Sequence, residues 1–359
     1  MTILALALAC LLCVLPAKAA PPEDWPGVGA LEQALPSEAE TWMPPGTPSE
    51  FDLQGLWETI SGPAEEKLRQ AFAEEWKTAG VLLTVCVLIA LADTLDASGG
   101  TPRYILLAGV TAIGAASLED FDYYLNLGLG SVRSMTDYSR ALLPVLASAS
   151  AAAGSVTGAA GRYAATALFM DLLTNAADRW IVPGICACAA LSIADAAVGN
   201  QALKTAKKLL KSLCRLLLTA LCLSFTAWLS FSGIVTDSAD AMTARMAKTA
   251  VSAALPVVGG ILSDAAGTLA AAAGTLRVSV GAYGIAAVLC TCLGPFIILG
   301  VRYLTFKVSA ALCGCVSDKR LSTLVEDLSG CFGMVLALNG TAALMMFVSI
   351  YSLIRTVIW

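Results

Sequence analysis

The sequence predicts an all-α, polytopic membrane protein, and its composition is the first reason. Of the 359 residues, 57% are hydrophobic and 14% are charged, and the mean hydropathy is +0.75. A soluble domain carries about 25% charged residues. Long uncharged runs end at charged residues, as membrane-spanning helices do. Stretches dense in Ala, Gly, Ser and Thr complete the pattern, because small residues let helices pack closely in lipid.

The first twenty residues predict a cleavable signal peptide (1–20). An apolar run ends at Ala17-Lys18-Ala19, which fits the A-x-A cleavage pattern. We expect cleavage after Ala19 or Ala20. An uncleaved anchor helix is the alternative, because the amino terminus is the only positive charge before the apolar run.

Residues 21–78 predict an acidic extracytoplasmic segment. They hold twelve acidic and three basic residues, a net charge of −9. The proline-rich first half predicts extended chain. From Pro63 the sequence PAEEKLRQAFAEEW predicts a short helix with proline at its first position. An acidic, lysine-poor segment after a signal peptide is expected outside the cytoplasm.

Residues 79–118 predict a transmembrane helical hairpin. The uncharged runs 78–92 and 104–118 have fifteen residues each. As helices they rise only about 22 Å, short of the ~30 Å hydrocarbon core, so we expect both to extend into their polar flanks. The turn at 93–103 is then expected to face the cytoplasm.

The remainder predicts two parallel copies of one membrane repeat, 119–242 and 243–359. Two proline pairs share an offset of 112 residues: Pro144 with Pro256, and Pro183 with Pro295. Each copy has an amphipathic helix (118–142 and 236–254), which we expect on the outer membrane surface or against a partner.

Each copy then predicts an inward leg, a basic patch and an outward span. The inward legs are 162–198 and 276–316, and the sequence leaves open whether each crosses once or three times. Lys204–Lys211 and Lys319–Arg320 mark basic patches that we expect in the cytoplasm. The outward spans are 216–235 and 331–354.

The candidate sites serve helix packing and assembly rather than chemistry. Residues 255–274 read LPVVGGILSDAAGTLAAAAG, and 143–161 open in the same way. Close packing in lipid requires such small residues. The candidates are Pro144, Gly154, Gly158, Pro256, Gly259, Gly260, Asp264 and Gly267.

Three carboxylates, Asp171, Asp195 and Asp264, are candidate intramembrane charges. An ionisable residue at membrane depth is a functional hypothesis. The alternative is that these residues cap helices or lie at the interface.

Several kinds of chemistry are disfavoured. The chain has no histidine, which removes histidine bases and most zinc and haem sites. The three C-x-C pairs place two thiols about 200° apart on a helix, a poor geometry for one metal. A P-loop sequence is absent. We therefore expect no catalytic residue, no metal, no cofactor and no nucleic-acid partner.

A signal peptide, an acidic extracytoplasmic N-terminus and a polytopic body around LPVVGGILSDAAGT resemble the stage III sporulation protein AE family of endospore-forming bacteria. The resemblance implies a non-enzymatic subunit of a channel complex between mother cell and forespore. Its implied partners are the other stage III sporulation A-operon membrane proteins and, through the complex, stage II sporulation protein Q. ATP hydrolysis would come from a separate subunit. The implied location is the mother-cell membrane surrounding the forespore, with the N-terminus in the intermembrane space.

Two alternatives remain open. A stand-alone secondary transporter built from two repeats needs a mid-membrane substrate site, for which Asp171 and Asp264 are the obvious lining groups. A two-aspartate intramembrane protease is the third possibility, although the G-x-G-D context of such enzymes is absent.

The parallel repeat makes a topology prediction. Reporter fusions should place Lys204–Lys211 and Lys319–Arg320 in the cytoplasm and Trp359 outside, because each copy starts and ends on the outer side. The mature chain should begin at Ala20 or Pro21. A cytoplasmic Trp359 would contradict the even number of crossings.

Overall fold

The chain folds into helices, as the sequence predicts. A computed structural model describes residues 28–43, 53–95, 103–119, 121–254 and 259–355. All regular elements within these ranges are helical. They are α2 (Val28–Gln33), α3 (Ser37–Glu40), α4 (Leu53–Leu95), α5 (Arg103–Leu118), α6 (Phe121–Ala152), α7 (Val156–Ala176), the π-helical turn η1 (Ala177–Ile181), α8 (Val182–Val198), α9 (Gln201–Ala254), α10 (Gly259–Val316) and α11 (Lys319–Arg355).

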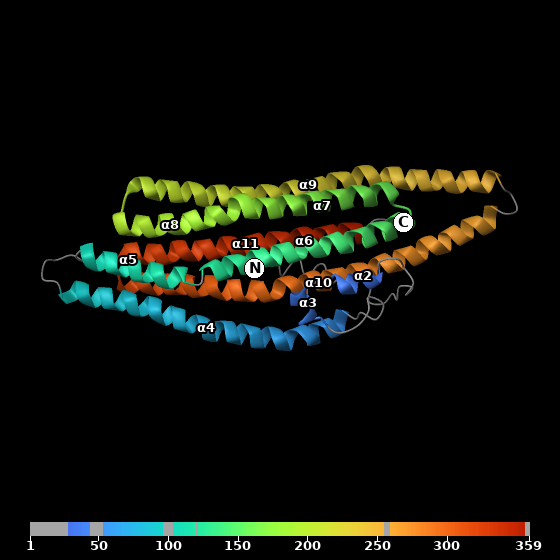
Figure 1. Cartoon of the computed structure of the whole chain (residues 1–359). Helices are drawn as coiled ribbons and strands as arrows, with labels where there is room; N and C mark the ends of the chain where they lie inside the picture. Colours follow the sequence, from blue (N-terminus) through green and yellow to red (C-terminus); the bar gives the residue numbers. More distant parts are fainter. Residues whose placement is uncertain (1–27, 44–52, 96–102, 120, 255–258, 356–359) are drawn as a thin grey trace.

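Six helical runs among the described residues are long and apolar enough to cross a membrane. They lie side by side in an elongated bundle (Figure 1). The end of α4 and the start of α5, the α8–α9 turn and the α10–α11 turn lie together at the left of Figure 1, which we call the turn end. Helices α4 and α5 pack against each other where the sequence predicts a hairpin over 79–118. Helix α4 extends well into its polar flanks, while α5 runs only from Arg103 to Leu118. That the pair spans a membrane stays a prediction.

The inward legs are continuous helical runs. Residues 156–198 form one run through α7, η1 and α8, and α10 has 58 residues without a break. Three crossings would need two turns in each leg, and neither run contains one. A 58-residue helix is about 87 Å long, against a hydrocarbon core of ~30 Å. Helix α10 is therefore far longer than one perpendicular crossing of a bilayer requires.

The π-helical turn explains how Pro183 fits into a continuous helical run. Proline lacks an N–H donor and its ring clashes with the carbonyl four residues earlier. The wider turn at Ala177–Ile181 lies directly before α8, where Pro183 occupies one of the first two positions. Such single π-turns are a common way to absorb a local mismatch within a helix.

Helices α10 and α11 form the centre of the bundle, with α4 and α6 packed against α10. Glycines allow this close approach. A Cβ atom at Gly284 would lie 2.6 Å from Leu142 Cδ2 of α6, and one at Gly281 would collide with Ile354 of α11. In lipid, such van der Waals fit takes the role that hydrophobic burial has in water.

Helix α6 contains the predicted amphipathic helix, but its apolar side is not available to a membrane surface. Its apolar stripe from Phe121 to Leu142 is buried, and α6 packs on α10, α11 and α7 of the same chain. The prediction of a helix on the outer membrane surface is therefore wrong for this segment. The apolar stripe of α6 packs against the other helices of the bundle.

The N-terminal segment also differs from the prediction. Pro63 lies inside α4, which begins at Leu53 and continues into the first apolar run, so no separate helix begins at Pro63. The proline-rich half is not wholly extended, since it forms α2 and α3. Leu31 and Trp42 are buried there, and α3 packs on α10.

Two predictions stay untested. The signal peptide lies outside the described residues, as does Pro256 of the first proline pair. Pro183 follows a π-turn at the start of α8, whereas Pro295 lies within α10. The tandem repeat thus stays a prediction.

A buried ion pair joins α4 to α10. Arg302 Nη1 lies 3.0 Å from both carboxylate oxygens of Glu75, and the two side chains are 1% and 5% exposed. Tyr124 of α6 donates its hydroxyl to Glu75 Oε1 at 2.6 Å. The guanidinium also lies 4.5 Å from the Tyr124 ring centroid and contacts two phenylalanine rings. Three helices therefore share one neutralised charge pair.

Adjacent tyrosines give a matched test of this cluster. Tyr124→Phe removes the donor to Glu75 and keeps the ring, so the free energy of unfolding should fall by roughly 1.5–3 kcal/mol, the contribution of a hydrogen bond to a charged group. Tyr123 is 56% exposed, and Tyr123→Phe should cost less than about 0.5 kcal/mol. Unfolding by denaturing detergent in mixed micelles measures both. Equal effects would contradict the role of the Tyr124 hydroxyl.

Candidate functional site

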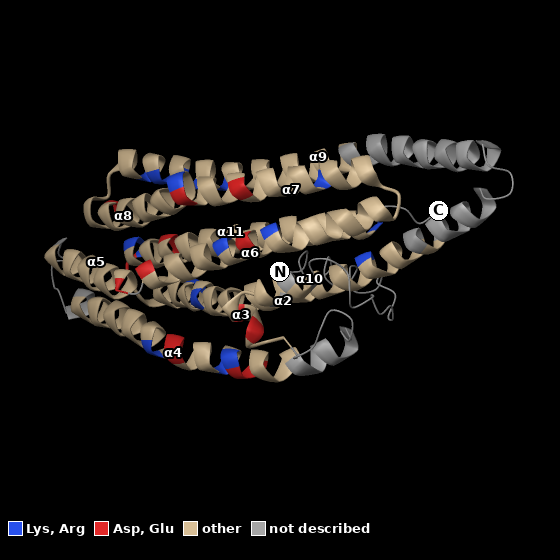
Figure 2. Cartoon of the chain, turned by 45° about the vertical axis from the view of Figure 1, so that its right-hand side comes forward, with Lys and Arg blue, Asp and Glu red and all other residues tan. Residues whose placement is uncertain are grey.

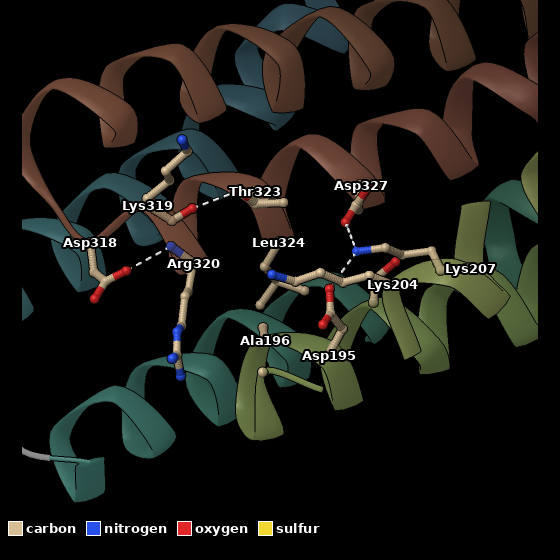
Figure 3. A pocket seen from close by; sticks show the side chains of 12 residues that line it. Asp195, Ala196, Lys204, Lys207, Asp318, Lys319, Arg320, Thr323, Leu324 and Asp327 are labelled. Atoms are coloured by element: carbon tan, nitrogen blue, oxygen red, sulfur yellow. Dashed lines mark hydrogen bonds and ion pairs between the residues drawn. The ribbon is translucent and has the colours of Figure 1, made fainter. Parts of the chain in front are cut away.

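A cavity of about 310 Å³ lies at the turn end, between α8, α9 and α11. Charged side chains form much of its wall (Figure 3). The lining residues are Ser192, Asp195, Ala196, Gly199, Lys204, Lys207, Asp318, Lys319, Arg320, Thr323, Leu324 and Asp327. Much of the rest of the described bundle is uncharged (Figure 2), so this concentration of charge makes the cavity the candidate site.

Lys207 forms the deepest part of the site. Its ammonium lies 2.8 Å from Asp195 Oδ2 and 2.5 Å from Asp327 Oδ2, and Figure 3 shows it between the two carboxylates. The Lys207 side chain is 9% exposed and that of Asp195 5%. An ion of this kind can be buried only when a partner neutralises it.

Lys211, one helical turn further along α9, completes the network. Its ammonium lies 2.7 Å from Asp327 Oδ1 and donates to the Asp327 backbone carbonyl at 3.2 Å. Two lysines of α9 thus neutralise one carboxylate of α8 and one of α11. The network joins the consecutive helices α8 and α9, through Asp195 and Lys207 12 residues apart, to Asp327 of α11, which lies 120 residues after Lys207.

The outer part of the site carries free positive charge. Among the described residues, the side chains of Lys204, Lys319 and Arg320 form no ion pair. Figure 3 shows Lys319 pointing away from Arg320. The cavity can therefore hold an anion, while the paired lysines at its base are already neutralised.

Two loop residues fix the shape of the opening. Gly199 ends α8 with φ 71°, a left-handed conformation that favours glycine. A Cβ there would lie 3.2 Å from Arg320 Cζ, so the guanidinium rests close against the α8–α9 turn. Asp318 Oδ1 accepts the Arg320 backbone N–H at 2.7 Å and so caps the start of α11.

The predicted carboxylates have different environments. Asp195 belongs to the buried network. Asp171 is on the bundle surface, where Arg140 Nη2 lies 2.8 Å from it and the side chains are 51% and 61% exposed. Asp264 lies in α10, but its side chain is outside what the structure describes.

The predicted packing residues are only partly described. Pro144 is exposed within α6, Gly154 has φ 103° in the α6–α7 turn, and Gly158 is buried. Pro256 is outside the described residues. The side-chain surroundings of Gly259, Gly260 and Gly267, in the first turns of α10, are also outside them. Their role in assembly stays a prediction.

Two of the three C-x-C pairs have one buried and one exposed cysteine, whereas Cys290 and Cys292 are both buried. Cys186 is exposed and Cys188 buried, and Cys315 is exposed while Cys313 is buried. The two thiols of these pairs thus face different surroundings.

Sequence reasoning missed the partners of the buried charges. Lys207 and Lys211 were assigned to a cytoplasmic basic patch, and Asp327 was not singled out at all. Lys207 and Lys211 are four residues apart and so share one helix face, which is the one local signal available. Asp327 pairs with Lys207 and Lys211 only because α9 and α11 pack against each other.

The same chemical change in two carboxylates tests the burial argument. Asp195→Asn leaves Lys207 with less compensating charge in a buried place, and we expect a loss of about 3 kcal/mol in the free energy of unfolding. Asp171→Asn breaks an exposed pair and should cost less than about 1 kcal/mol. Denaturing-detergent titrations compare them. A larger loss for Asp171→Asn would overturn the assignment.

Comparison with known proteins gives the family. The family model described as stage III sporulation protein AE matches residues 50–356. Stage III sporulation protein AE of Bacillus subtilis (strain 168) is 23% identical over 272 residues, which cover 75% of this chain and 68% of that protein. No solved structure matches. The match covers every helix from α4 to α11, and the chain belongs to the stage III sporulation protein AE family.

Proposed function

We propose that this chain is a non-enzymatic integral membrane subunit of a multiprotein export or channel complex that links mother cell and forespore during endospore formation. The observation that carries the proposal is the family match over 50–356 on a bundle with six candidate membrane spans in its described part. The proposed partners are the other stage III sporulation A-operon membrane proteins and, through them, stage II sporulation protein Q.

The length of the helices supports a role in assembly. Helices α9 and α10 have 54 and 58 residues, about 80 Å or more each. A bundle that only crosses a bilayer needs about 20 residues in each helix. The extra length places helical surface outside the membrane, where partner subunits can contact it. We propose that this part faces the intermembrane space and that the turn end faces the cytoplasm of the mother cell.

The state of the buried charges supports a structural rather than a catalytic role. Glu75, Asp195 and Asp327 each face a lysine or arginine of another helix. Carboxylates held in this way neutralise partners and tie helices together. In the proposed complex, energy from ATP comes from a separate subunit.

Assembly should depend on the small residues at the start of α10. Gly260→Leu or Gly267→Leu should abolish co-purification with the partner subunits while membrane insertion stays intact, because leucine raises apolarity but spoils close fit. Gly300→Leu is the matched control, since a Cβ there meets no described atom within 4 Å. Affinity purification from sporulating cells measures the effect.

Two other results would count against the proposal, and the second would favour a stand-alone transporter. Normal co-purification of both glycine variants would make the stretch a lipid-facing spacer and contradict the packing role. Substrate uptake by the purified chain alone in vesicles would favour a stand-alone transporter, because a complex subunit requires its partners.

A further inference from the structure

We propose that the cavity at the turn end binds the phosphate of an anionic phospholipid headgroup. This inference does not rest on the export function, since it follows from charge, shape and surrounding surface alone. The cavity of about 310 Å³ lies at the small end of the range of ligand pockets, a size suited to a headgroup.

The charge of the cavity selects an anion. Among its acidic side chains, Asp195 and Asp327 are neutralised by Lys207 and Lys211. Asp318 accepts a backbone N–H at the start of α11 and keeps its negative charge, but three outer cations outnumber it. The outer cations Lys204, Lys319 and Arg320 lack ion-pair partners in the described part of the chain. A guanidinium fork and an ammonium are both groups that bind phosphate oxygens.

The contact of Arg320 with the α8–α9 turn gives the cavity a defined wall, which a diffuse basic surface lacks. The guanidinium lies against Gly199, where a Cβ would come within 3.2–3.3 Å of its Cζ and both terminal nitrogens. Glycine at this position both ends α8 and leaves room for the arginine. The buried Lys207 network beneath holds α8, α9 and α11 at the spacing that keeps the cavity open.

The surface around the cavity identifies a lipid as the source of the phosphate. Val198 and Val316, which directly precede the α8–α9 and α10–α11 turns, are 56% and 55% exposed. Leu209 of α9 and Leu312 of α10 are also exposed. Aliphatic surface therefore continues to the turn end, where acyl chains can cover it while the headgroup occupies the cavity. Basic pockets between transmembrane helices bind anionic headgroups in this way.

The test compares two double variants of the full-length chain in detergent. Native mass spectrometry measures the binding of phosphatidylglycerol, phosphatidylcholine and inorganic phosphate. Lys204→Gln with Arg320→Gln removes two cations from the cavity, and the affinity for phosphatidylglycerol should fall roughly 25-fold, at about 1 kcal/mol for each charge. Lys208→Gln with Arg215→Gln removes two exposed cations of α9 that do not line the cavity. This control should change affinity less than about threefold.

The wild-type chain should bind phosphatidylglycerol at least tenfold more tightly than phosphatidylcholine, and millimolar inorganic phosphate should not displace it. Unfolding midpoints of both double variants should match the wild type, because their side chains are exposed and unpaired. Equal affinity for the two lipids, or an equal loss in the two double variants, would overturn the site. Full displacement of phosphatidylglycerol by inorganic phosphate would assign the cavity to free phosphate and contradict the proposal of a lipid ligand.

Discussion

A charge buried in an apolar bundle must have a partner of opposite sign, and this constraint fixes the arrangement of the helices. Leaving one ion unpaired costs several kcal/mol, and lipid offers no water to relieve it. Two clusters in the described part of the chain show how the constraint is met. Glu75 and Arg302 join α4 to α10, and Lys207 and Lys211 join α9 to Asp195 of α8 and Asp327 of α11. Each pairing holds in only one relative position of the helices, so the charges specify register where apolar contacts alone would tolerate sliding.

Close packing between these anchor points comes from small residues. Gly281 and Gly284 allow α10 to touch α11 and α6, and the apolar stripe of α6 is buried between them. The result is a long bundle of which only part fits within a bilayer. A membrane subunit of an assembly needs these two properties: a core that holds itself together, and helical surface that reaches beyond the lipid.

The all-α membrane class could be predicted from hydropathy, because long uncharged runs bounded by charges have few alternative folds in lipid. The hairpin of α4 and α5 follows from this rule. The number of crossings in each inward leg could not be predicted. Helix boundaries could not all be predicted from the sequence. Pro63 fits a helix start by local rules but lies within α4, which begins ten residues earlier at Leu53. The stripe of α6 was correctly recognised as apolar, yet local periodicity does not say whether lipid, a partner or the chain itself covers it. The cavity was beyond local reasoning because Asp195, Lys207 and Asp327 meet only after folding.

A double-mutant cycle on Glu75 and Arg302 tests most directly whether buried charge pairs hold this bundle. Glu75→Gln and Arg302→Gln are made singly and together, and the free energy of unfolding is measured in mixed micelles. We expect each single change to cost about 3–5 kcal/mol, because it leaves the other charge buried and unpaired. The double variant should cost less than the sum of the two by at least about 1.5 kcal/mol. Costs that add within about 0.5 kcal/mol would show that the two charges do not depend on each other, and the pairing would then not be what holds α4 to α10.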